Sequence, residues 1–304
     1  MALPRRLIGV DWGTSALRVF RYDGEGAVVD RRETAQGLIH IDGGAFEAAL
    51  TEIVEGWREG PVALILCGMV GSHQGWIEAP YVPCPADADA LAAALAPLSS
   101  RLGPAFVVPG VSLSLPDRAD VMRGEETKVV GAAPPGWSGL VVSPGTHAKW
   151  VSVDQRSIAD FRTFMTGELF AVLSEHSLLA RTAAPGPDDP LAFEAGVRRG
   201  HEDRAITSLI FGARAEVLLG RMPGSAVRSY LSGLLVGAEL AGGLEGTRPG
   251  TPILVAGSEA LNPRYAAAFR ILGMPRVTMV DGETAAARGL WRLAVLAGLT
   301  EGDP

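Results

Sequence analysis

One carboxylate and two hydroxyl groups stand in the turn of the stretch LIGVDWGTSALRV, residues 7–19. Asp, Gly and Ser favour turns for local backbone reasons, so turn formation alone explains most sequences of this kind. Such a turn can also bind anions, because the backbone N–H groups of tight glycine turns form concavities and neighbouring hydroxyls add donors. The candidate phosphate ligands are Gly13, Thr14 and Ser15, and Asp11 could hold Mg²⁺ directly or through water.

A second turn of the same type occurs halfway along the chain, in SPGTHAKWV, residues 143–151. Placed under DWGTSALRV, it matches at four of nine positions with a constant offset, namely at the glycine, threonine, alanine and valine. One such turn in each half would clamp a triphosphate, with Gly145 and Thr146 as ligands. Lys149 could neutralise phosphate charge, and His147 is either a donor or a surface residue.

A third candidate element is ILVAGSEALNPRY, residues 253–265, a strand that ends in Gly257 and Ser258 and opens a helix. Glycine at this junction lets a ligand approach the backbone, and the helix N-terminus adds a positive end. Taken by itself, the segment reads equally as an ordinary strand-to-helix turn. The chain contains neither a P-loop nor a Gly-x-Gly-x-x-Gly after a strand, so those nucleotide-binding motifs lose support.

The order of the expected elements repeats, which indicates an internal duplication. In each half three strand-like runs precede a helix, a pattern that predicts a mixed α/β sheet. The first half has strands at 7–12, 17–22, 27–32, 62–67 and 105–108 and helices at 45–57 and 88–102. The second half has strands at 140–143, 149–153 and 157–164, a helix from about residue 166, and mainly helical segments after a Pro-rich loop at 181–190.

Composition argues against several classes of protein. The 304 residues are 47% hydrophobic and 20% charged with a formal net charge of −7, and no basic stripe is present to recruit nucleic acid. The longest apolar stretch, residues 61–70, is shorter than the ~20 residues that span a bilayer, and the start lacks the apolar region of a secretory signal. Cys67 and Cys84 form no Cys-x-x-Cys pair, so a reducing cytoplasm fits best.

The three turns together resemble the phosphate-1, phosphate-2 and adenosine motifs of the actin, heat-shock chaperone and sugar kinase superfamily. More specific segments, taken together, resemble the 2-dehydro-3-deoxygalactonokinase family, the sugar acid kinases of bacterial galactonate breakdown. The resemblance runs from residue 7 to about residue 291. Its most specific segments are CGMVGSHQGWIEAPYVPCPA (67–86), DVMRGEETKVVGA (120–132), SPGTHAKWV (143–151), FMTGELFAVLSEHSLL (164–179) and YLSGLLVGAEL (230–240).

This resemblance implies two ribonuclease H-like domains of the actin and hexokinase type with a nucleotide cleft between them. We expect the first domain over residues 1–118 and the second over 119–282, with a C-terminal helix in 283–304 that packs back on the first domain. The implied reaction transfers the γ-phosphoryl group of ATP to the 6-hydroxyl of 2-dehydro-3-deoxy-D-galactonate. Such a transfer needs positioning, charge neutralisation and an oriented hydroxyl.

The resemblance also implies an acidic base at the start of the helix that links the domains. In ADVMRGEETKVV the candidates are Asp120, Glu125 and Glu126, and we favour Glu125, then Glu126, because the Gly-acid step matches the Gly-Asp of related kinases. A glutamate in place of the aspartate departs from that pattern. The alternative is that these acids merely stabilise the first turn of a helix.

For the substrate carboxylate we expect Arg123, because a guanidinium can bind a carboxylate in a bidentate manner. Ser72, His73 and Gln74 form a polar loop, and Trp76 after it could pack on the sugar acid. The alternatives are a solvated loop and a core tryptophan. The segment 166–168 resembles the Gly-Gly-Glu turn near the nucleotide in related proteins, or is a plain helix N-cap.

Three functional hypotheses follow. The first is a cytoplasmic, Mg²⁺-dependent kinase that takes a small sugar acid and ATP, with no nucleic acid or membrane partner and with room for a homodimer. The second keeps the fold but changes the acceptor to 2-dehydro-3-deoxygluconate or another sugar acid. The third is a non-catalytic regulator that binds nucleotide and sugar, since one fold can serve many functions.

Overall fold

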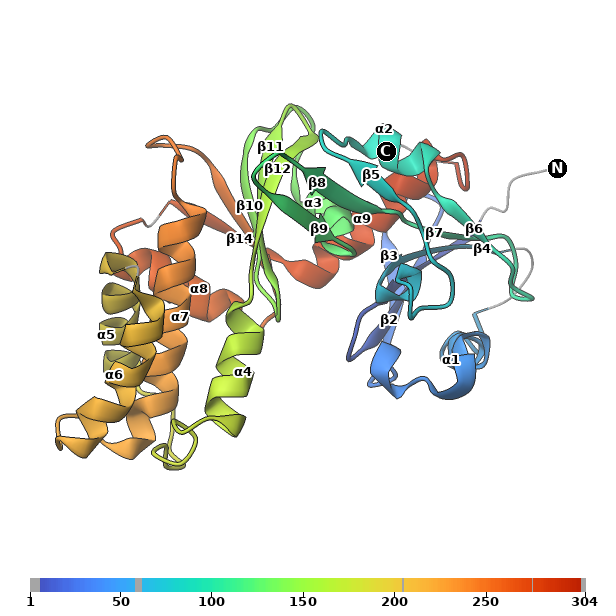
Figure 1. Ribbon diagram of the computed structural model, residues 1–304. Helices are drawn as coiled ribbons and strands as arrows, with labels where there is room; N and C mark the ends of the chain where they lie inside the picture. Colours follow the sequence, from blue (N-terminus) through green and yellow to red (C-terminus); the bar gives the residue numbers. More distant parts are fainter. Residues whose placement is uncertain (1–5, 58–61, 204, 275, 302–304) are drawn as a thin grey trace. The chain divides into compact units, whose positions relative to one another are not determined.

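The computed structural model describes residues 6–57, 62–203, 205–274 and 276–301 (Figure 1). The chain divides into two compact units. Unit 1 comprises Met1–Val141, Val151–Phe161 and Val280–Pro304, and unit 2 comprises Val142–Trp150 and Arg162–Met279. Unit 1 therefore takes in residues 119–141, which the sequence analysis assigned to the second domain; the predicted domain boundaries stay a prediction.

The first sheet has six strands in the order β3-β2-β1-β4-β7-β6. Strands β1, β2 and β3 form an antiparallel meander, whereas β4 and β7 continue the sheet parallel to β1. The apolar residues of β1 and β4 are buried, as expected for central strands covered on both faces. The bounds are β1 Arg6–Trp12, β2 Leu17–Tyr22, β3 Val28–Thr34, β4 Val62–Gly68, β6 Ala96–Leu98 and β7 Ala105–Val107.

A second sheet has five strands in the order β12-β11-β10-β13-β14. Its members are β10 Gly139–Ser143, β11 Ala148–Asp154, β12 Ser157–Phe164, β13 Ile253–Gly257 and β14 Val277–Asp281. In both sheets the first strand of the meander is central, with its second and third strands on one side and the later strands on the other. The predicted α/β class and the repeated element order are therefore confirmed.

A small third sheet, which the sequence analysis did not anticipate, belongs to unit 1. It has the order β5-β8-β9, with β5 Tyr81–Pro83, β8 Gly110–Ser114 and β9 Ala119–Met122. Strand β9 ends one residue before Arg123, so this sheet fixes where the segment that carries the candidate base begins.

The helices of unit 1 are α1 Phe46–Ile53, α2 Ala88–Ala93, α3 Glu125–Ala132 and α9 Gly282–Leu296. Those of unit 2 are α4 Thr166–His176, α5 Pro190–Glu202, α6 Ile206–Leu218, α7 Val227–Gly243 and α8 Asn262–Ile271, and α5, α6 and α7 lie side by side (Figure 1). Short 3₁₀ turns occur at Leu38–His40, Asp42–Gly44, Met69–Gly71 and Gly224–Ala226. Within the described ranges no helix combines the length and apolar character needed to cross a bilayer.

Two glycines let α3 and α9 approach until their backbones touch. A Cβ at Gly131 would lie 1.9 Å from the carbonyl oxygen of Ala285, and one at Gly289 would lie 1.9 Å from that of Thr127. Any larger residue would push the helices apart. Helix α9 also packs on β1 and β4, so the two glutamates that open α3 are held close to the end of the first sheet.

The helix expected over residues 88–102 was wrong in its second half. Helix α2 ends at Ala93, and residues 96–98 form β6, antiparallel to β7. Pro97 explains the difference, because proline lacks the N–H that a helix needs and disfavours the helical conformation of the residue before it.

Candidate active site

The first candidate phosphate turn closes directly after β1. The N–H of Gly13 donates to the carbonyl oxygen of Ala16 at 3.0 Å, and Thr14 and Ser15 are exposed. The following loop holds the turn from outside, since the N–H of Leu38 donates to Gly13 O at 3.0 Å. A Cβ at Gly37 would lie 2.2 Å from the carbonyl carbon of Ser15, so this contact needs glycine.

Asp11 lies beside this turn with its side chain 11% exposed. Its side-chain contacts among the described residues are long: Arg18 Nη1 is 4.0 Å from Oδ2, and Cys67 Sγ is 3.9 Å from Oδ1. Arg18 is shared, because it also pairs with Glu33 at 2.7 Å and with Glu283 at 3.2 Å. Burial, then the Asp11 charge, raises the pKa of the Cys67 thiol well above its ordinary value, so the thiol stays neutral.

The donor set around Asp11 fits Mg²⁺ bound together with a phosphate, and does not fit a metal held by protein alone. Over the described ranges no group of three or more His, Cys, Asp or Glu side chains gathers where it could hold a metal ion. Mg²⁺ usually keeps several waters and takes one or two carboxylates plus substrate phosphate oxygens. A single loosely engaged carboxylate beside exposed hydroxyls satisfies that requirement.

The three candidate bases lie in different environments. The Asp120 carboxylate accepts the N–H of Val121 at 2.8 Å, and Glu125, which is half-buried, accepts that of Arg123 at 3.2 Å. Glu126 is 0% exposed and accepts Gly124 N–H at 2.7 Å and the Thr127 hydroxyl at 3.0 Å. Burial, then the neighbouring Glu125 charge, raises the pKa of Glu126 to about 7. Of the two adjacent glutamates, only Glu125 presents surface to a substrate.

Arg123 is held by backbone and by an aromatic ring. Its Nη2 donates to the carbonyl oxygen of Ala79 at 2.8 Å, and its guanidinium carbon lies 4.3 Å from the centre of the Tyr81 ring. Its Nε and Nη1 atoms are buried without a hydrogen-bond partner among the described residues, and so is Ser72 Oγ. A Cβ built on Gly71, the neighbour of Ser72, would lie 3.0 Å from Arg123 Nη1.

One short backbone segment, residues 68–72, brings these groups of unit 1 together. A Cβ at Gly68 would lie 3.5 Å from Asp11 Oδ1, and a Cβ at Gly124 would lie 3.0 Å from the Cα of Gly68. Gly68 and Gly124 both have positive φ, at 94° and 104°, which explains the need for glycine at each. Asp11, the turn before α3 and Arg123 therefore surround the same segment.

The other residues of the predicted polar loop, His73, Gln74 and Trp76, do not join this group. His73 and Gln74 are exposed, and His73 Nδ1 lies 3.1 Å from Glu78 Oε2 at the surface. Trp76 packs in the core cluster of unit 1, stacked on Phe46 at 6.1 Å and edge-on to Trp12 at 6.4 Å. The core-tryptophan alternative thus accounts for Trp76, and Ser72 is the member of the loop with an unused buried polar atom.

The second candidate phosphate turn lies in unit 2. Thr146 and His147 are exposed, and a Cβ at Gly145 would meet nothing within 4 Å, so the turn is open. Lys149 is buried and its Nζ donates to the carbonyl oxygen of His147 at 3.1 Å. The ammonium group therefore supports the backbone of the turn.

The first turn of α4 packs against this hairpin. A Cβ at Gly167 would lie 2.5 Å from the carbonyl oxygen of Gly145, and Glu168 N–H donates to that of Thr146 at 3.0 Å. His147 Nε2 contacts the Glu168 carboxylate. The segment 166–168 is thus part of the same turn structure. Thr166 opens the helix without serving as its side-chain cap.

The third candidate element follows β13 in unit 2. Gly257 N–H donates to the Asn262 side chain at 3.0 Å, and the N–H of Leu261 donates to Ser258 Oγ at 3.3 Å. Gly257 is buried and Ser258 is exposed. A Cβ at Gly257 would lie 2.6 Å from Asn262 Oδ1, which makes glycine necessary here for packing alone.

Sequence reasoning missed Tyr81, which stacks on Arg123, and Glu239, a buried acid on α7 with three side-chain donors. An aromatic residue or a lone glutamate carries no motif. A glutamate inside the apolar run YLSGLLVGAEL was the one signal that could have marked Glu239.

Comparisons with known proteins show which family the chain belongs to. A family model described as 2-keto-3-deoxy-galactonokinase matches residues 11–293. The chain is 38% identical over 292 residues to 2-dehydro-3-deoxygalactonokinase of Escherichia coli (strain K12), covering 96% of this chain and 98% of that protein. A crystal structure from Sinorhizobium meliloti, assigned to the same enzyme, has a TM-score of 0.89 at 34% identity and covers 95% of this chain and 98% of that one.

A more distant structure shares the fold alone. Component A of (R)-2-hydroxyglutaryl-CoA dehydratase from Acidaminococcus fermentans has a TM-score of 0.55 at 12% identity, covering 97% of this chain and 100% of that one. The predicted fold class, two ribonuclease H-like domains of the actin and hexokinase type, is confirmed, and so are the kinase class and the predicted family. The chain belongs to the 2-keto-3-deoxy-galactonokinase family.

Proposed function

We propose that this protein transfers the γ-phosphoryl group of ATP to the 6-hydroxyl of 2-dehydro-3-deoxy-D-galactonate. Family membership supports the reaction and the acceptor. The observation that carries the proposal within this chain is a pair of Arg123 guanidinium nitrogens that have no hydrogen-bond partner among the described residues, next to Gly71, with the Ser72 hydroxyl in the same state. Buried donors without an acceptor are costly, so such a group indicates a ligand that supplies one.

The ligand that best satisfies these donors is a carboxylate. Arg123 Nη2 is already bonded to Ala79 O, and the Tyr81 ring fixes the guanidinium plane. The remaining Nε and Nη1 lie on different edges of the guanidinium group and offer N–H groups to acceptor oxygens, and the Ser72 hydroxyl adds a further donor. A neutral sugar would pair with this cation less well, which favours a sugar acid as the acceptor substrate.

Glu125 is the preferred base. In the transfer, the substrate oxygen forms a bond to the γ-phosphorus, the bond between that phosphorus and the bridging oxygen of ATP breaks, and the hydroxyl proton passes to the Glu125 carboxylate. ADP leaves with the electron pair of the broken bond. Glu126 is enclosed and engaged with Gly124 and Thr127, and Asp120 lies on β9, whereas Glu125 is the half-buried acid at the start of α3.

ATP would be met by the glycine turns. Thr14 and Ser15, which follow Gly13, offer backbone and hydroxyl donors in unit 1, and Gly145 and Thr146 do so in unit 2. The junction at Gly257 and Ser258 would take the nucleoside part. Asp11 would hold Mg²⁺, directly or through water, and the ion when bound would neutralise phosphate charge. A cytoplasmic location, the absence of nucleic acid and membrane partners, and a homodimer stay predictions.

The test is an assay coupled to ADP release with Mg²⁺-ATP and 2-dehydro-3-deoxy-D-galactonate, run beside the gluconate epimer. We expect selective turnover of the galactonate, because the relatives are named as galactonokinases. The ratio of the two kcat/KM values measures the discrimination between the epimers. Asp11→Ala should lose at least about 100-fold in kcat/KM. Asp117→Ala, which changes an exposed aspartate of the same unit, is the matched control.

Each other result has a defined meaning. Equal or better turnover of the gluconate would change the acceptor but keep the kinase. Binding of ATP and sugar acid without turnover would favour the regulatory hypothesis. Full activity of Asp11→Ala would refute the role of the first turn.

A further inference from the structure

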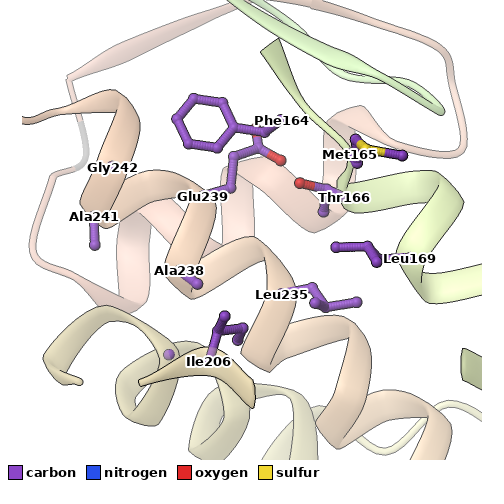
Figure 2. A pocket seen from close by; sticks show the side chains of 11 residues that line it. Phe164, Met165, Thr166, Leu169, Ile206, Leu235, Ala238, Glu239, Ala241 and Gly242 are labelled. Carbon is purple, nitrogen blue, oxygen red and sulfur yellow. The ribbon is translucent and has the colours of Figure 1, made fainter. Parts of the chain in front are cut away.

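Glu239 is a buried acid in unit 2 that lies outside the predicted motifs. It is 2% exposed, on a helix whose neighbouring positions are mostly apolar. Trp150 Nε1 donates to its Oε1 at 2.8 Å and the Tyr265 hydroxyl donates to its Oε2 at 2.7 Å. The Thr166 side chain makes a third hydrogen bond, and Figure 2 shows the Thr166 and Glu239 oxygens turned toward one another.

Each of the three donors belongs to an element that adjoins a proposed nucleotide contact of unit 2. Trp150 is on β11, directly after the second phosphate turn. Thr166 begins α4, whose next two residues contact that turn through Gly145 and Thr146. Tyr265 is on α8, the helix that follows the turn at Gly257. One carboxylate on α7 therefore joins β11 and α8, which each follow one of the proposed ATP contacts of unit 2, and α4, which packs on one of those contacts.

Helix α4 packs on α7 through Phe170 and Leu173, which lie against a buried cluster that includes Leu231 and Leu235. At the first turn of α4 a cavity of about 260 Å³ lies between the two helices, lined on its apolar side by Phe164, Leu169, Ile206 and Leu235 (Figure 2). The same cavity is bordered by Thr166 and Glu239. Across this gap the hydrogen bond between these two side chains adds a polar contact to the apolar packing of the two helices.

A carboxylate at this position is expensive to bury. Desolvation raises the pKa of Glu239, and the three donors offset only part of that penalty. A well-packed apolar residue often stabilises a fold as well as or better than a buried ion does. The presence of a glutamate at position 239 is thus better explained by the three segments that it holds in place than by a gain in stability.

We propose that Glu239 is a positioning residue for nucleotide binding. It fixes the relative positions of the second phosphate turn, the first turn of α4, and helix α8, so that all three can contact ATP. This inference rests on the proposed function, in which unit 2 binds ATP. Glu239 acts through Thr166, Trp150 and Tyr265 and does not touch the nucleotide.

The test compares Glu239→Gln with the wild-type chain by calorimetric titration with a non-hydrolysable Mg²⁺-ATP analogue. Glutamine removes the charge, and its amide nitrogen cannot accept a hydrogen bond, so a hydroxyl that donates at that position has to turn and accept instead. We expect the Kd for the analogue to rise about tenfold, and the KM for ATP with it, while the KM for the sugar acid changes less than about twofold. Tyr265→Phe, which removes one donor and keeps the carboxylate, should give a smaller rise in the same direction.

Glu245→Gln is the matched control, because it alters an exposed carboxylate just beyond the end of α7 that pairs with Arg162. An unchanged Kd in Glu239→Gln would overturn the inference. So would equal increases for nucleotide and sugar acid together with a lower melting temperature, since those indicate a general loss of structure. Absence of analogue binding by the wild-type chain would instead refute the proposed function, and this inference with it.

Discussion

Replacing Glu126 by glutamine should make the protein more stable at alkaline pH. The carboxyl group is 0% exposed, and burial, then the Glu125 charge, raises its pKa to about 7 from an ordinary 4.5. Glutamine preserves both contacts: its carbonyl oxygen can accept Gly124 N–H, now at 2.7 Å, and its amide can donate to the Thr127 hydroxyl. The substitution therefore removes a charge without removing a hydrogen bond.

The sign and size of the effect follow from proton linkage. Between pH 4.5 and 7 the folded chain binds a proton at Glu126 that the unfolded chain has released, so the free energy of unfolding falls as pH rises. Each pKa unit corresponds to about 1.4 kcal/mol, which gives a penalty of about 3 kcal/mol, fully present above pH 7 and absent below pH 4.5. Glu126→Gln should escape this penalty.

Urea unfolding of both chains from pH 4.5 to 8.5 measures the difference. The two should be equally stable at the acidic end and diverge by up to about 3 kcal/mol in favour of the variant at the alkaline end. Glu202→Gln, at an exposed position in unit 2, provides the baseline. Parallel pH curves for wild type and Glu126→Gln would refute the reasoning, because they would mean that the group is ionised in the folded chain.

Three further predictions concern the site and its support. Arg123→Lys should raise the KM for the sugar acid about 10- to 100-fold with the KM for ATP unchanged, because an ammonium cannot replace two fixed N–H groups; steady-state kinetics with each substrate varied decides this. Glu125→Gln should lower kcat at least about 100-fold with little change in either KM, and undiminished turnover would reject it as the base. Tyr22→Phe should cost about 1 to 3 kcal/mol in urea unfolding, because the buried hydroxyl donates to Ala287 O at 2.6 Å and ties β2 to α9; an unchanged midpoint would contradict this.

The amino-acid sequence by itself determined the features that depend on near neighbours. The two Gly-Thr turns, their flanking strands and the repeated element order are local patterns, and the structure contains them. The family could also be predicted, because its segments are contiguous runs of residues. The Ala-rich run around Pro97 favoured a helix over residues 88–102, although proline disfavours a helix interior, and residues 96–98 form β6 instead.

Only the tertiary structure decided which polar groups are enclosed and which are available. Glu125 and Glu126 are adjacent and chemically alike, but α9, which follows more than 150 residues later, packs on α3 and leaves one half-buried and the other sealed. Arg123 gains its orientation from Ala79 and Tyr81, and Glu239 its donors from three distant segments. Burial and hydrogen bonding are properties of a three-dimensional neighbourhood, and the residues that create it are scattered along the chain.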